Sequence, residues 1–323
     1  MTRPWLRQAL YWILCIAVSG ILLYYSLRGV DWRGVWRIVT HANLVYLAAA
    51  AAITTWSFFL RALRWRILLN AERRFRVSTV FWANMAGYLG NSFLPARAGE
   101  VLRSVLISTQ SGLSKTYVLT TALSERMMDV IALVLCSSIV LMGITPKPAW
   151  MLDASRLMAA VAIAGALFVA IAPHTGPLIE SFVKRIPLPE RIRAAVLSLT
   201  GQVLSGVRTF HDWGRFGGFS ALTAIIWASD GLGAVTGAHA LGLHVSFPVA
   251  LLLLTAMGLG SALPSTPGYV GVYQFAAVTA LTPFGVSRDG ALAFILVAQV
   301  LAYVLVLLWG LPGLYLLRRK RPT

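Results

Sequence analysis

Long apolar segments are the feature that most constrains what this chain can fold into. Six runs are each long enough to cross a hydrocarbon core of ~30 Å as a helix. They lie near residues 10–27, 43–63, 117–142, 155–173, 217–241 and 289–316. Hydrophobic residues make up 58% of the 323 positions and charged residues 12%, as in integral membrane proteins rather than soluble domains. We therefore expect an all-α polytopic membrane protein with about six transmembrane helices.

Two further apolar segments are interrupted near their middle. One covers 77–108 and is broken at Pro95; the other covers 248–284 and is broken within "LPSTPGYVGVYQ". Each half is too short to cross a membrane comfortably, and proline and glycine interrupt helices. The pattern predicts two re-entrant helical hairpins, with eight spans containing broken helices as the alternative.

The distribution of basic residues predicts the orientation. The chain has 28 Lys and Arg against 11 Asp and Glu, a net charge of +17. Placing both termini in the cytoplasm puts most of these cations on the cytoplasmic side, as the positive-inside rule requires. We expect a multi-pass protein of the cytoplasmic membrane. Because the cations lie between apolar runs, anionic lipid headgroups are the expected partner and nucleic acid is not.

This topology divides the chain into two similar parts. Residues 1–142 and residues 155–316 each give two spans, a hairpin and a span, but they start from opposite sides of the membrane. That order is typical of the inverted repeats of transporters, so we predict two membrane repeats. Between the first two spans of the second repeat, residues 189–210 have apolar positions at helical spacing and basic residues between them. They predict a cytoplasmic amphipathic helix, lying either on the membrane surface or against the protein's own spans.

Two sets of charged residues lie inside apolar surroundings. Arg97, Glu100 and Arg103 repeat every three residues after Pro95, so they share one helical face. The second set lies near the middle of a predicted span. It comprises Glu125, Arg126 and Asp129, and Asp230 occupies a similar depth in another span. An unpaired charge at this depth costs at least ~2.5–3.5 kcal/mol, so these groups should face a protein interior or a wet cavity.

These charges admit two interpretations. They could line a polar cavity that receives a charged headgroup, with Arg97 or Arg103 supplying the cation that Glu125 and Asp129 need. They could instead be a self-satisfied network that holds the first hairpin against the third span. We predict in either case that the face carrying Arg97, Glu100 and Arg103 lies against the face carrying Glu125 and Asp129.

The second interrupted segment offers a different kind of surface. Its candidate headgroup-binding residues are Pro264, Ser265, Thr266, Gly268 and Gly271, with Pro267 as a further helix breaker. Interrupted helices expose backbone N–H groups, which favour phosphate. The alternative is a tight turn between packed half-helices.

The remaining motifs are less specific. Gly233 and Gly237 form a GxxxG pair, typical of a close contact between helices. Cys15 and Cys136 lie in apolar runs and are expected to be buried thiols. The sequence has no nucleophile–base pair, metal-ligand spacing or phosphate-binding loop, so we expect no cofactor, no metal and no enzyme, although a lipid-linked transferase stays open.

Three motifs resemble the signature regions of the lysylphosphatidylglycerol synthase transmembrane-region family, whose members are also called flippase-like domain proteins. These are "NSFLPARAGEVLRSVLIS", "TTALSERMMDVIAL" and "LPSTPGYVGVYQFAAVTAL". The resemblance implies functional or structural roles for the residues that match. In the first motif they are Asn91, Pro95, Arg97, Gly99, Glu100 and Arg103; in the second, Glu125, Arg126 and Asp129; in the third, Pro264, Pro267, Gly268 and Gly271.

The chain departs from this family pattern in two respects. Members often have Glu after the aromatic residue of the third motif, whereas here Tyr273 is followed by Gln274. Full synthases add a soluble aminoacyl-transfer domain, whereas this sequence stops at Thr323. We therefore expect that this chain does not synthesise an aminoacyl lipid by itself.

Taken together, the sequence predicts translocation of an anionic or isoprenoid-linked lipid between leaflets. Arg97 and Arg103 would contact the lipid phosphate from one side, and the Pro-Gly hairpin would contact it from the other. One alternative is an accessory subunit of a lipid-linked glycosyltransferase pathway, acting with a lipid-modifying enzyme. Another is a membrane scaffold that transports nothing.

Overall fold

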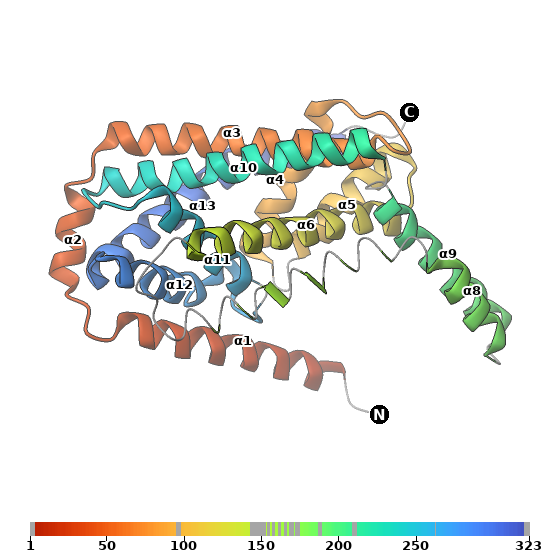
Figure 1. The fold of residues 1–323 in the computed structure, drawn as a ribbon, viewed down its shortest axis with the longest axis horizontal. Coiled ribbons are helices and arrows are strands. Elements are labelled where there is room, and N and C mark those ends of the chain that lie inside the picture. The colour runs from red at the N-terminus through yellow and green to blue at the C-terminus, as the bar shows by residue number, and fades with distance from the viewer. Residues whose placement is uncertain are drawn as a thin grey trace.

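The fold is known from a computed structural model. It describes residues 4–94, 98–142, 175–186, 189–208, 212–261 and 263–319, together with eight separate positions between 153 and 171. The described residues form α-helices and short 3₁₀ turns and no β-strand, so the expected all-α fold is confirmed for them (Figure 1).

The first two helices form a sharp corner. Helix α1 (Pro4–Leu27) extends the predicted run 10–27 towards the N-terminus, and α2 (Trp32–Thr40) follows at 86° to it. The side chain of Asp31 caps α2 by accepting a hydrogen bond from the Arg33 N–H. Trp32 and Trp36 are exposed on α2, which the sequence analysis did not identify as a helix.

The rest of the first half contains one long helix, a hairpin and a second long helix. Helix α3 runs over Leu44–Leu69 and is capped by Asn43. The hairpin consists of α4 (Val77–Phe93) and α5 (Ala98–Ser111), and α6 covers Lys115–Met142. Pro95, at the predicted break, lies outside the described residues.

The second half repeats this order where it is described. The predicted span 155–173 lies mostly outside the described residues, and α8 (Gly176–Arg185) follows it. The predicted amphipathic segment contains α9 (Glu190–Arg208), and α10 spans Trp213–Ala240. The second interrupted segment contains α11 (Phe247–Gly260), the turn η4 (Pro267–Tyr269), α12 (Val272–Leu281) and the turn η5 (Thr282–Phe284). Helix α13 (Arg288–Arg319) completes the chain.

Three described helices are long and apolar enough to cross a membrane: α3, α10 and α13. The bent pair α1–α2 makes a fourth if it counts as one span. Helix α6 has 28 residues, which is also enough length, but Glu125, Arg126 and Asp129 interrupt its apolar character. The chain is therefore a multi-pass helical membrane protein by the length and composition of its helices.

The helices pack across the two halves. Helix α3 lies along α10, as Figure 1 shows, and α9 packs on α6 while α8 and α9 extend from one end of the bundle. Helix α4 of the first hairpin packs on α13, and α11 of the second hairpin packs on α6. Each hairpin thus contacts the last helix of the opposite half. One apolar core surrounds Trp65 and Phe219, and a second surrounds Leu253 and Phe294.

Glycines allow the two helices of the first hairpin to touch. A Cβ atom added to Gly99 would overlap the carbonyl oxygen of Gly87, and one added to Gly90 would lie 2.8 Å from the Gly99 Cα. Backbone approach this close excludes any larger residue. Because Glu100 directly follows Gly99, this contact sets how deep the charged face of α5 sits in the bundle.

Candidate functional site

A network of eight charged side chains lies between the helices of the first half and α10. Four are cations and four are anions, so the network has no net charge. Its members are Arg61, Arg64, Glu100, Arg103, Glu125, Arg126, Asp129 and Asp230. Charges removed from water are tolerated when they are paired and hydrogen-bonded, and each of these meets an opposite charge.

Arg64 is the centre of the network and is completely buried. Its Nη1 and Nη2 atoms donate to the two carboxylate oxygens of Asp129 at 2.5 and 2.9 Å, a bidentate pair. Nη2 and Nε also donate to Glu125 Oε1, at 2.9 and 3.3 Å, and Nη1 donates to Thr223 Oγ1 at 3.1 Å. One guanidinium therefore bridges the like-charged pair that Glu125 and Asp129 make one helical turn apart.

Arg103 joins the first hairpin to α6. Its Nε donates to Glu100 Oε2 at 2.6 Å, and its Nη1 donates to Asn84 Oδ1 at 2.7 Å and to Glu125 Oε2 at 3.1 Å. The guanidinium lies 4.4 Å from the centre of the Trp65 ring, a cation–π contact. The predicted contact between the two charged faces is thus present. Only 1% of Arg103 is exposed, so protein groups enclose it on all sides.

Arg61 and Arg126 occupy the edge of the network that faces a cavity. Arg126 donates from Nε to Glu100 Oε1 at 2.9 Å, and its Nη1 lies 3.7 Å from Asp129 Oδ2. Arg61 forms an ion pair with Asp230, and its Nη1 lies 3.9 Å from Asp129 Oδ2. The side chain of Arg126 is 28% exposed, more than any other member of the network.

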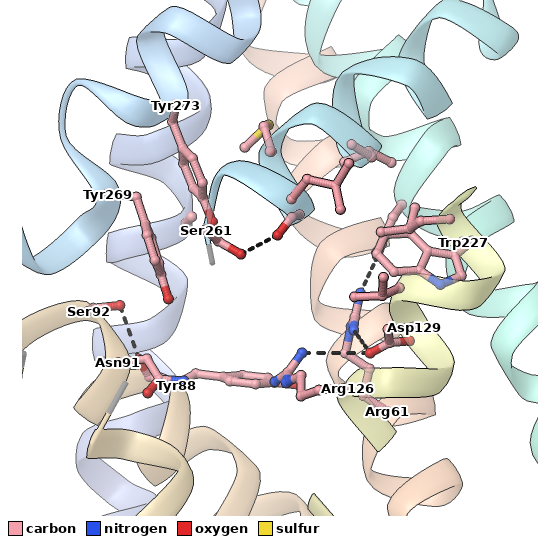
Figure 2. Close-up of a pocket in the computed structure, with 18 of the residues that line it drawn as sticks. Arg61, Tyr88, Asn91, Ser92, Arg126, Asp129, Trp227, Ser261, Tyr269 and Tyr273 are labelled. Atoms are coloured by element: carbon pink, nitrogen blue, oxygen red, sulfur yellow. Dashed lines mark hydrogen bonds and ion pairs between the residues drawn. The ribbon is translucent and has the colours of Figure 1, made fainter. Parts of the chain in front are cut away.

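The cavity has a volume of about 370 Å³, within the usual range for ligand pockets. Figure 2 shows Tyr269 and Tyr273 on one side of it and Asp129, Arg61 and Trp227 on the other. Helices α3, α4, α6, α10, α11 and α13 contribute to the wall, as do both interrupted segments. The polar residues of the wall are Arg61, Tyr88, Asn91, Ser92, Glu100, Arg126, Asp129, Asp230, Ser261, Tyr269 and Tyr273.

A second, more apolar cavity of about 200 Å³ adjoins the first. The two share Asp230, Leu254, Met257 and Ala302 in their walls. Gly233 and Gly237 line the second cavity between α3, α10, α11 and α13. A Cβ at Gly233 would make an ordinary 3.4 Å contact with Ile53, and one at Gly237 would lie 3.6 Å from Phe294. Gly233 and Gly237 therefore leave space for the second cavity beside α10.

A chain of amides fixes the turn of the second hairpin. Gln274 Oε1 accepts from the Gly271 N–H at 2.7 Å, and its Nε2 donates to Gln299 Oε1 at 2.6 Å. Gln299 Nε2 and the Tyr303 hydroxyl both donate to the Gly268 carbonyl, each at 3.1 Å. An ionised Glu at 274 could not donate to Gln299. The amide that departs from the family pattern therefore fits its surroundings here.

Two of the backbone donors predicted to meet a phosphate have partners within the protein. The Thr266 N–H donates to Ser19 Oγ on α1 at 3.0 Å, and the Gly271 N–H is bound by Gln274. Pro264, Ser265, Thr266 and Gly268 do not line either of the two cavities, whereas Tyr269 and Tyr273 line the larger one. This hairpin meets the larger cavity with tyrosine side chains rather than with backbone N–H groups.

The other predicted site residues are placed as follows. Asn91, Glu100, Arg126, Asp129 and Asp230 lie together on the wall of the larger cavity. Glu125 and Arg103 are behind that wall, 1% exposed each, and Gly99 is the contact point of the hairpin. Pro95 and Arg97 lie outside the described residues, so the role predicted for Arg97 stays a prediction from the sequence.

Sequence reasoning missed two central cations, Arg61 and Arg64. Both lie in "LRALRWR", where the predicted span 43–63 ends, whereas α3 continues to Leu69 and carries them into the bundle. Their spacing of three residues on an apolar helix, together with the two carboxylates near the middle of α6 that need a cation, could have identified them. The cavity tyrosines Tyr88 and Tyr269 carried no comparable signal.

Comparison with known proteins agrees with these motifs. A curated relative, "Glycosyltransferase AglD" of Haloferax volcanii, is 23% identical over 308 residues, which cover 85% of this chain and 49% of that protein. The chain thus spans about half the length of this relative. Residues 12–310 match the family described as "Lysylphosphatidylglycerol synthase TM region". The chain belongs to the lysylphosphatidylglycerol synthase transmembrane-region family.

Proposed function

We propose that the protein moves an anionic or isoprenoid-linked lipid between the leaflets of the cytoplasmic membrane. The observation that carries the proposal is the pair of adjoining cavities: charged or polar residues make up about half of the lining of one, whereas the other is lined mostly by apolar side chains. A lipid has the same division between headgroup and chain. The larger cavity would receive the headgroup and the smaller one the first part of an acyl or isoprenoid chain.

The ionic network supports the headgroup site in two ways. It places a partly exposed guanidinium, that of Arg126, on the cavity wall, and guanidinium groups bind phosphate oxygens well. It also holds that guanidinium with Glu100 and Asp129, which keeps its position when the cavity is empty. Arg103 would act behind the wall by orienting Glu100, rather than by touching lipid. Arg97 would meet the phosphate at the cytoplasmic mouth.

The packing of the two halves supports a transporter with an inverted repeat. If the two halves are exchanged, α3 corresponds to α10, α4 to α11 and α6 to α13. The contact of α4 with α13 then becomes the contact of α11 with α6, and the contact of α3 with α10 is unchanged. In this proposal the hairpins α4–α5 and α11–α12 are re-entrant and approach each other from opposite sides. Both termini are cytoplasmic.

A second candidate is a membrane subunit that serves a lipid-linked glycosyltransferase. The name of the relative from Haloferax volcanii favours it, because that protein is called a glycosyltransferase and is about twice as long as the matched part. In this reading the cavities would hold a lipid-linked sugar carrier for an enzyme, without carrying it across the membrane.

Lipid movement in a purified system separates these candidates. The protein would be reconstituted into phosphatidylcholine vesicles containing a trace of phosphatidylglycerol labelled on its acyl chain with a dithionite-sensitive dye. We expect dithionite to bleach dye beyond the outer-leaflet fraction in vesicles that contain protein. Bleaching that stops at the outer-leaflet fraction, as in protein-free vesicles, for both this probe and a labelled isoprenoid phosphate, would contradict transport.

A further inference from the structure

We infer that the larger cavity selects a lipid whose headgroup carries a polyol or glycosyl group in addition to its phosphate. The inference rests on the proposed function and specifies its substrate. The polyol or sugar would stack on Tyr269 and Tyr273 and donate hydroxyl hydrogen bonds to the carboxylates on the opposite wall. The source of the polyol is a lipid headgroup, because the adjoining apolar cavity provides room for a chain.

The aromatic wall is the first observation. The rings of Tyr269 and Tyr273 are stacked, with centroids 4.8 Å apart and planes inclined by 17°. Both line the cavity, and Figure 2 shows them side by side. Trp227, Tyr88 and Phe58 complete the aromatic part of the wall. Aromatic faces with polar edges suit the C–H faces and hydroxyl groups of a sugar ring, whereas a phosphate alone gains nothing from them.

The backbone at Tyr269 is the second observation. Tyr269 has a φ of 60°, and it is the only non-glycine residue with positive φ among those described. Such a conformation is unfavourable for a side chain with a Cβ and persists where the surroundings enforce it. Gln299 and Tyr303 enforce it by holding the carbonyl of the preceding Gly268. Gln274 in turn holds Gln299, so three side chains fix the position of this one ring.

The charges on the wall are the third observation. Asp129, Asp230 and Glu100 outnumber Arg61 and Arg126 there, and both cations already contact carboxylates. A multiply charged phosphate alone would meet more negative than positive groups. Hydroxyl groups can donate to the remaining lone pairs of these carboxylates without displacing any guanidinium. The wall therefore offers one phosphate contact, at Arg126, and several acceptors for hydroxyl groups.

The experiment compares acyl-labelled lipids in the same vesicles. Phosphatidylinositol carries a phosphate and a polyol, phosphatidic acid carries a phosphate alone, and lysyl-phosphatidylglycerol carries a cationic aminoacyl group. We expect phosphatidylinositol to move at least about tenfold faster than phosphatidic acid and faster than the aminoacyl lipid. Equal rates for the first two, or a faster aminoacyl lipid, would overturn the inference and leave the proposed transport intact. No movement of any probe would instead refute the proposed function.

Variants of the tyrosine wall test the same point. Tyr269→Leu and Tyr273→Leu should each slow phosphatidylinositol about tenfold while changing phosphatidic acid less than about twofold. The control is Tyr46→Leu, an exposed tyrosine outside both cavities, which should change neither rate. Rates are normalised to protein that elutes as a folded species. A uniform slowing of all lipids by both cavity variants would contradict polyol recognition. Inhibition by free myo-inositol at the concentration of the lipid probe would also overturn the inference, because it would assign the site to a soluble polyol rather than to a lipid headgroup.

Discussion

At the scale of single residues, the network couples the first hairpin to α6 through Arg103 and Glu125. Their ion pair, with 3.1 Å between Nη1 and Oε2, is almost fully buried. Removing one partner of such a pair leaves an uncompensated charge and costs about 3–5 kcal/mol. Removing both partners leaves less charge unpaired, so the losses of stability from the two single substitutions should not be additive.

The first prediction is a double-mutant cycle on this pair. Arg103→Gln and Glu125→Gln should each lower the free energy of unfolding in detergent micelles, and their interaction energy should exceed about 0.5 kcal/mol. The control cycle uses the ion pair of Arg193 with Glu190, whose carboxylate is exposed; it should give about 0–0.5 kcal/mol. Additive losses at Arg103 and Glu125 would mean that the two faces do not touch.

Sequence reasoning at this scale identified the buried charges and one of their two main partners. It placed Glu125 and Asp129 near the middle of a span, where an unpaired charge is unfavourable. It also indicated that a cation from another helix must pair with these two carboxylates. It proposed Arg103 or Arg97; Arg103 does pair with Glu125, and Arg64, which it missed, pairs with both Glu125 and Asp129. Spacing along one helix identifies which residues share a face, but the helix that supplies the partner depends on tertiary packing. The amide chain of Gln274 was equally invisible, because its other members lie in distant parts of the chain.

At the scale of elements, the contact of α4 with α5 depends on glycine. Replacing Gly99 by Ala would drive a methyl group into the Gly87 carbonyl, and the helices would have to separate. That movement would also shift Glu100 and Arg103, which follow on the same helix.

The second prediction follows from this contact. Gly99→Ala should lower the free energy of unfolding by about 1–3 kcal/mol, as overpacking does. Gly217→Ala is the matched control, because Gly217 lies within α10, beyond its first turn, and a Cβ there meets nothing within 4 Å. It should be neutral or stabilise the protein by up to about 1 kcal/mol. Equal stability of the two variants, measured by thermal unfolding, would contradict the tight packing of the hairpin.

The third prediction concerns the apolar cavity beside α10. Gly233→Leu should fill part of it and slow lipid transport about tenfold, while folded protein is obtained in similar amount. Ala224→Leu places the same side chain on an exposed face of the same helix and should leave transport unchanged. If Gly233→Leu transports at the unmodified rate, the apolar cavity does not hold a lipid chain.

The helices themselves were largely predictable. Apolar runs and Pro or Gly interruptions gave ranges close to those of α3, α6, α10 and α13, because length and hydropathy decide which segments become long helices. Helix α2 was missed because it is short and amphipathic, with two arginines among its nine residues. The two cavities could not be predicted, because they depend on residues from eight helices.

At the scale of the whole molecule, the topology is the fourth prediction. In a variant lacking Cys15 and Cys136, Arg74→Cys should resist an impermeant maleimide in intact cells, and Thr282→Cys should react with it. Both positions are exposed, so a difference in labelling reports the side of the membrane. Labelling of position 74 from outside would invert the proposed orientation, and labelling of both would place the two segments on one side.

The central claim is that the larger cavity carries the lipid headgroup, and Arg126 tests it most directly. The measurement is the rate of dithionite-accessible phosphatidylinositol movement in proteoliposomes, per molecule of folded protein. We predict that Arg126→Gln nearly abolishes transport and that Arg126→Lys, which keeps the charge but loses the planar fork, retains an intermediate rate. Arg97→Gln, argued from the sequence, should also reduce it, and Gly217→Ala should match the unmodified protein. Transport by Arg126→Gln at the unmodified rate would contradict the account, because the network would then be a brace and the cavity would not be the path of the headgroup.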